Sequence, residues 1–181
     1  WMTVPDSPII YSLGIRGDGL EKVAKRWRKE WEYRGELRRK VPDGLLLTIG
    51  LNDTANIGRQ DGRPQLSADA FQFGLQQLLS EIKKNTYVMV MGLTPVNESA
   101  MPFAECLWYS NKSCSIYERE IEQTCIDLDI PFLATHRMML KEPSWINWIE
   151  PDGIHLNSHG HNWLYKKLIN WQSLLDWSEF K

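Results

Sequence analysis

The fold is decided by the stretch GLLLTIGLND, residues 44–53, in which an apolar run lies between two glycines and is followed by polar residues. The run does not alternate between apolar and polar residues, as a half-exposed strand would. Continuous apolar runs of this length are typical of strands that are buried on both faces of a parallel sheet. The stretch therefore predicts a strand over Leu45 to Ile49, with Asn52 and Asp53 just beyond its carboxyl end.

Similar apolar runs alternate with segments of helical periodicity along the rest of the chain. Strands are predicted over Ile9 to Leu13, Tyr87 to Met91 and Pro131 to Ala134. Apolar residues recur at helical spacing over 20–31, 71–82, 117–128 and 158–175, and a capping box of Ser115 with Glu118 is expected to open the third of these helices. This order predicts one doubly wound α/β domain over residues 1–181, with a parallel sheet covered by helices on both faces.

Composition excludes several classes of protein. The chain has 181 residues and a formal net charge of −2, which gives no sign of a nucleic-acid partner. No apolar run approaches the roughly 20 residues of a membrane span. There is no visible signal peptide, and the three cysteines are odd in number and lack a C-x-x-C spacing. We therefore expect a cytoplasmic protein without a membrane span.

Polar residues follow the predicted strands at the edge where such sheets bind ligands. A glycine-rich turn, residues 14–19, follows the first strand, and Asn52 follows the second. An asparagine there can direct its side-chain N–H groups at a developing oxyanion. Alternatively, the glycines only reverse the chain and Asn52 only caps its own turn.

Asp152-Gly153-Ile154-His155 follows the fourth strand after a short helical stretch. An aspartate three residues before a histidine can accept the Nδ1–H of the ring, which leaves Nε2 free to act as a base. The alternative is an exposed loop histidine beside a capping aspartate. His155, His159 and His161 together also suggest a metal site, but no carboxylate or cysteine completes a ligand set, and Asn157 or Ser158 is expected to cap a helix there.

The segment from Thr94 to Ser113 is long for a connection and carries several aromatic residues. Long ordered loops at this edge of a sheet often shape a substrate pocket. We therefore expect Phe103 and Trp108 to line the substrate-binding side of the site. The alternative is a loop that its aromatic residues fasten to the surface.

Together, the glycine turn, Gly-x-Asn-Asp and Asp-x-x-His resemble the later sequence blocks of the SGNH hydrolases, also called GDSL-type esterases and lipases. The stretches 11–18 and 24–27 resemble a bacterial subgroup of lipases in particular. The resemblance implies a three-layer α/β/α, flavodoxin-like fold. It also implies that Gly17 N–H and the Asn52 side chain form an oxyanion hole, that Asp152 and His155 are the acid and base, and that no cofactor or metal is needed.

The resemblance also implies a Gly-Asp-Ser block on a first strand, and this chain has none. Ser7 is a poor match because no glycine or apolar run precedes it, prolines flank it, and only ten residues separate it from Gly17. Trp1 is also an unusual first residue. We therefore expect the chain to be incomplete at its N-terminus, with the first strand and the nucleophilic serine upstream of Trp1.

The sequence thus predicts a serine esterase that acts on a small ester through an acyl-enzyme. A binding module that has lost its nucleophile is the alternative, and a metal-dependent hydrolase is a third option.

Overall fold

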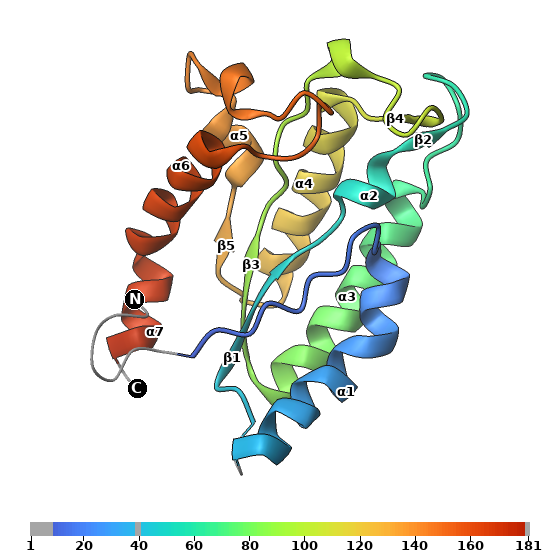
Figure 1. Ribbon diagram of the computed structural model, residues 1–181. Helices are drawn as coiled ribbons and strands as arrows, with labels where there is room; N and C mark the ends of the chain where they lie inside the picture. The colour runs from blue at the N-terminus through green and yellow to red at the C-terminus, as the bar shows by residue number, and fades with distance from the viewer. Residues whose placement is uncertain (1–8, 39–40, 180–181) are drawn as a thin grey trace.

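The computed structural model describes residues 9–38 and 41–179, and its centre is a parallel sheet in the order β1–β3–β5 (Figure 1). The strands are β1 (Gly44–Thr48), β3 (Tyr87–Met91) and β5 (Phe132–Leu133). Gly44 lies opposite Tyr87, and Val90 lies opposite Phe132. A small antiparallel pair, β2 (Asn56–Ile57) and β4 (Leu107–Trp108), lies apart from this sheet. The predicted parallel sheet is confirmed.

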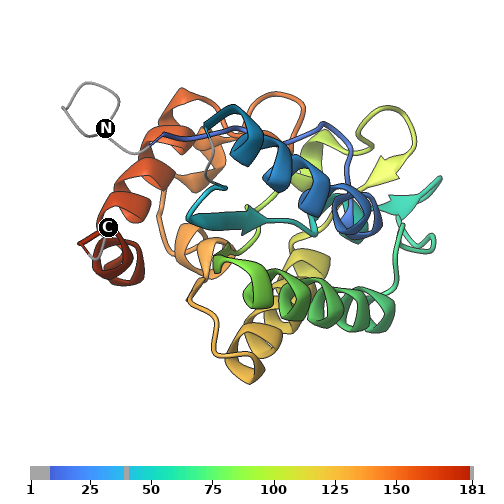
Figure 2. The same cartoon turned by 90° about the horizontal axis from the view of Figure 1, so that it is seen from below.

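Helices cover both faces of this sheet, as Figures 1 and 2 show from two directions. One face carries α1 (Leu20–Arg38), α3 (Ala68–Asn85) and α4 (Asn111–Asp127), and the other carries α6 (Ser158–Ile169) and α7 (Gln172–Glu179). The short helices are α2 (Leu51–Thr54), η1 (Glu98–Ala100), α5 (Thr135–Met139) and η2 (Trp145–Trp148). The predicted three-layer α/β/α fold is confirmed. Within 9–38 and 41–179, none of the helices is both long and apolar enough to cross a membrane.

The core forms on both faces of β3. Val88 and Val90 join a buried cluster with Phe71 and Leu75 of α3. Successive side chains of a strand point to opposite faces. The buried side chains of Met89 and Met91 therefore face the layer of α6 and α7. An apolar run without alternation is thus the natural sequence for a strand that both helix layers cover.

The predicted strand over Ile9 to Leu13 is wrong. These residues form no strand, and the side chains of Ile9 and Ile10 are 55% and 66% exposed. A strand needs a neighbour to complete its hydrogen bonds, and in the described chain β1 has β3 on one edge and no strand on the other. An apolar run therefore does not make a strand by itself.

The capping box is also wrong. Helix α4 begins at Asn111, and Ser110 caps it by accepting the Ser113 N–H at 3.1 Å. Glu118 lies inside the helix, where its carboxylate accepts the backbone N–H groups of His136 and Arg137 at the start of α5. Glu118 thus caps a different helix from the one that the sequence pattern indicated.

The last helix differs from the prediction in its length. Asn157 caps α6 by accepting the N–H groups of His159 and Gly160, as expected. The helix then ends at Ile169, and a separate helix, α7, begins at Gln172. Asn170 forms the break, because its backbone leaves the helical conformation at the C-cap.

Candidate active site

The Asp152–His155 turn lies at the carboxyl end of the sheet and is closed by its own backbone. Glu150 N–H donates to the His155 carbonyl oxygen at 2.7 Å, and Gly153 N–H donates to the Glu150 carbonyl oxygen at 2.9 Å. Gly153 has a φ of 84°, a left-handed conformation that disfavours residues with a Cβ. Glycine between Asp152 and His155 therefore allows the tight turn that brings their side chains together.

Within the turn, His155 Nδ1 lies 2.5 Å from Asp152 Oδ2. The other carboxylate oxygen of Asp152 accepts the backbone N–H groups of Ile154 and His155, each at 3.0 Å. With Nδ1–H directed at the carboxylate, Nε2 carries the lone pair of the neutral ring. The side chain of His155 is 51% exposed, so the ring can be reached from outside the protein.

The same contacts set the ionisation of Asp152. Partial burial alone would raise the pKa of this carboxyl, but the hydrogen bonds from Ile154 N–H and from His155 outweigh burial and lower the pKa below its usual value. Asp152 therefore stays ionised at neutral pH and accepts the hydrogen bond from His155 as a carboxylate.

The loop after β3 supports this turn. Asn97 N–H donates to the Gly153 carbonyl oxygen at 2.8 Å. A Cβ on Gly153 would lie 2.7 Å from the Cβ of Ala100, so the two loops pack closely. The turn that carries His155, the candidate base, is thereby fixed to the loop that follows β3.

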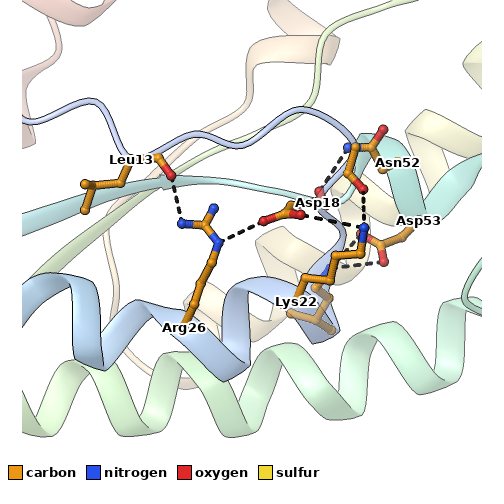
Figure 3. A network of polar contacts seen from close by, with 8 residues as sticks. Leu13, Asp18, Lys22, Arg26, Asn52 and Asp53 are labelled. Carbon is orange, nitrogen blue, oxygen red and sulfur yellow. Dashed lines mark hydrogen bonds and ion pairs between the residues drawn. The ribbon is translucent and has the colours of Figure 1, made fainter.

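Asn52 lies in α2, directly after β1. Gly50, at the N-cap of α2, has a φ of 118° and packs against Phe71, so the chain turns sharply here. Asn52 Nδ2 donates to the Asp18 carbonyl oxygen at 2.9 Å (Figure 3). Its Oδ1 accepts from the Tyr109 hydroxyl at 3.4 Å. These two contacts fix which way the amide faces and leave one of its two N–H bonds for a ligand.

Gly17 directly precedes Asp18, the residue to which the Asn52 amide donates. It has a φ of 76° and is exposed, and Asp18 N–H closes the turn by donating to the Ile15 carbonyl oxygen at 3.2 Å. Asn52 bonds to Asp18, the residue after Gly17. The structure thus brings the two predicted oxyanion donors together, although 35 positions separate them in the sequence (52 − 17).

The loop over residues 94–113 contacts both His155 and the Asn52 amide. The Phe103 ring lies edge-on to His155, with centroids 6.1 Å apart, and edge-on to Tyr109, with centroids 6.2 Å apart. Tyr109 then reaches Asn52 through its hydroxyl. Of the two residues predicted to line the substrate-binding side, Phe103 lies beside His155. Trp108 lies in β4 opposite Asn56, and no described contact joins it to His155.

Two residues of this site were not predicted from the sequence. Burial raises the pKa of Tyr109 to about 12, so its hydroxyl is protonated at neutral pH and donates to Asn52. Asp53 is buried and accepts Leu20 N–H at 3.1 Å with both carboxylate oxygens. The signal for Asp53 is Gly19, because a Cβ there would lie 2.5 Å from the Asp53 carboxylate.

The other two histidines that suggested a metal site lie in α6. His159 and His161 are exposed in the first turn of α6. In the described ranges, no three side chains of histidine, cysteine, aspartate or glutamate come together as metal ligands would. Ser7 lies outside the described residues.

A groove of about 560 Å³ lies between α1 and α3. Its lining includes Leu20, Ala24, Phe73 and Gly74, and none of the candidate residues contributes to it. We therefore assign this groove no part in the chemistry.

Comparisons with known proteins agree with the fold described above. The sequence model of the GDSL-like lipase/acylhydrolase family matches residues 3–163. The solved lipase/acylhydrolase of Enterococcus faecalis superposes with a TM-score of 0.66 and 18% identity over 82% of this chain and 67% of that one. A GDSL-like lipase of Bacteroides thetaiotaomicron gives a TM-score of 0.65 and 17% identity over 88% and 72%.

An acetyl xylan esterase gives a TM-score of 0.62 and 17% identity, over 89% of this chain and 78% of that one. Our chain thus spans 67% to 78% of the length of these three structures. No curated protein sequence matches it. At these identities the solved structures establish the shared fold, and the sequence model establishes the family. The chain belongs to the GDSL-like lipase/acylhydrolase family.

Proposed function

We propose that the protein hydrolyses a carboxylic ester through an acyl-enzyme, with His155 as the base and with a serine upstream of Trp1 as the nucleophile. The observation that carries the proposal is the 2.5 Å contact between His155 Nδ1 and Asp152, which leaves Nε2 open to a serine hydroxyl. Family membership supports ester chemistry in general.

The reaction follows from these groups. His155 Nε2 takes the proton of the serine hydroxyl as its oxygen attacks the ester carbonyl carbon. The negative charge on the carbonyl oxygen is held by Gly17 N–H and by the Asn52 amide. His155 then gives its proton to the departing alcohol oxygen, and Asp152 stabilises the protonated ring in between. Water then attacks the acyl-enzyme while His155 takes its proton. The bond to the serine oxygen breaks, His155 returns the proton to that oxygen, and the acid is released.

The open edge of β1 in the described chain is where we propose that a strand upstream of Trp1 pairs. β1 pairs with β3 along one edge, and the described chain places no strand along the other. Leu46 of β1 is 43% exposed, although the run around it has the sequence of a strand buried on both faces. A strand added beside β1 would cover this edge, and its carboxyl end would lie near Asn52.

The test uses the protein translated from its native gene, with whatever precedes Trp1, and p-nitrophenyl acetate as the ester. Replacing His155 with alanine should lower kcat by about 10³-fold or more with little change in KM, because the general base is lost. His159→Ala is the matched control, since His159 is also exposed and lies outside the site. Full turnover by the His155 variant would refute the proposal.

A further inference from the structure

Asp18, at the end of the glycine turn, forms hydrogen bonds to both Asn52 and Arg26 (Figure 3). Its backbone oxygen accepts from Asn52 Nδ2 at 2.9 Å, and its carboxylate Oδ2 accepts from Arg26 Nε at 2.8 Å. Lys22 approaches the other carboxylate oxygen at 3.7 Å. The residue that fixes the Asn52 amide is therefore itself fixed by a cation of α1.

Arg26 also holds the far end of the same segment. While Nε bonds to Asp18, Nη1 donates to the Leu13 carbonyl oxygen at 2.9 Å and to Glu30 on the next turn of α1 at 2.9 Å. A single planar guanidinium thus bridges both ends of the segment 13–18, which carries Gly17. A lysine ammonium is a point charge and does not reproduce this fork.

Burial separates this ion pair from ordinary surface pairs. The side chains of Arg26 and Asp18 are 21% and 10% exposed, whereas that of Lys22 is 66% exposed. Exposed ion pairs contribute little because water and salt screen them. Arg26 is therefore the stronger constraint on Asp18.

The segment depends on such side-chain contacts because its backbone has no strand ladder. Residues 9–18 form neither helix nor strand, and Ile15 is 54% exposed, so little apolar burial holds the turn in place. A small shift of this turn would move Gly17 N–H and would remove the acceptor that directs the Asn52 amide.

We propose that Arg26 is a positioning residue, whose guanidinium holds the turn 13–18 so that Gly17 N–H and the Asn52 amide face one point. The inference rests on the proposed ester hydrolysis. It adds a role for Arg26, which keeps the two proposed oxyanion donors in a fixed position relative to each other.

The test compares Arg26→Lys with Arg28→Lys in the protein from the native gene. Arg28 is the matched control because it lies on the same helix and makes two hydrogen bonds to Glu81 at 3.1 and 2.9 Å, without contacting the turn. Arg26→Lys should lower kcat for p-nitrophenyl acetate by about 10- to 100-fold with KM within about twofold, since misplaced donors mainly affect the transition state. Arg28→Lys should leave both constants within about twofold.

A second readout separates positioning from general loss of structure. In ¹H–¹⁵N NMR spectra, Arg26→Lys should shift the Gly17 amide and Asn52 side-chain signals, while the signals of α4 and the thermal midpoint match those of Arg28→Lys. Equal kcat values in the two lysine variants would overturn the inference, because charge alone would then suffice. If the wild type hydrolyses no ester, the proposed function fails. The NMR signals then decide about Arg26 alone, and unshifted Gly17 and Asn52 signals would overturn its positioning role.

Discussion

Asp53 carries a carboxylate into the interior beside the glycine turn. Burial raises its pKa to about 6, and the hydrogen bond from Leu20 N–H opposes that rise only in part. The same bond provides an acceptor for the first N–H of α1, where the positive end of the helix favours an anion. Asp53 thus anchors the start of α1 at the cost of a buried charge.

This cost makes a prediction about pH. Because the folded-state pKa of Asp53 lies above the unfolded value of about 3.9, the folded protein binds this proton more tightly. The stabilising contribution is complete below about pH 4 and is lost as pH rises through about 6. Each unit of pKa difference is worth about 1.4 kcal/mol, so the free energy of unfolding of the wild type relative to Asp53→Asn should fall by up to about 3 kcal/mol between pH 4 and pH 7.

Urea denaturation at pH 4, 5, 6 and 7 measures this difference. Asp61→Asn serves as the control, because the Asp61 side chain is 82% exposed and its charge is not buried on folding. Parallel pH profiles for the wild type and Asp53→Asn would contradict the account of Asp53.

At this scale the sequence pointed to the candidate residues more directly than to the residues that hold them in place. Asp152 and His155 are three positions apart, so a local turn is enough to join them. Asn52 and Gly17 each follow an apolar run. Tyr109 and Asp53, in contrast, are defined by contacts with residues 57 and 33 positions away, which no local pattern contains.

The loop between β3 and α4 brings an aromatic ring next to His155, the proposed base. Phe103 lies 6.1 Å from His155 between ring centroids, whereas Trp108 pairs with β2. We predict that Phe103→Ala shifts the preference among p-nitrophenyl esters towards longer acyl chains, because the lost ring opens space next to the base. Trp108→Ala should shift it less.

The ratio of kcat/KM for butyrate to that for acetate measures this preference. Phe73→Ala is the control, because Phe73 is 64% exposed on α3 and lies outside the site. A ratio that stays at the wild-type value in a folded Phe103→Ala protein would contradict the assignment of Phe103 to substrate binding.

Elements were predictable where the pattern and the packing partner lie in the same chain. β1 and β3 pair with each other, so their apolar runs become strands. The run from Ile9 to Leu13 has the same character but no partner in the described residues, and it stays irregular. Glu118 shows the same limit, since its spacing from Ser115 fits a local cap while its carboxylate caps α5.

Across the whole molecule, the parallel arrangement of the strands determines where the candidate residues meet. The carboxyl ends of parallel strands meet at one edge of the sheet, so residues after different strands converge. The Asn52 helix, the loop with Phe103 and the Asp152–His155 turn all lie at that edge (Figure 1). This convergence was predictable from the order of strands and helices alone. The strand expected beside the other edge of β1 stays a prediction, because the described residues place no strand there.

The most direct test of the central claim is to label the protein from its native gene with a fluorophosphonate probe and to map the labelled peptide by mass spectrometry. The account predicts one labelled serine in a peptide N-terminal to Trp1, with labelling lost in His155→Ala and retained in His159→Ala. A folded wild-type protein that takes no label, or a label on any serine within residues 1–181, would contradict it.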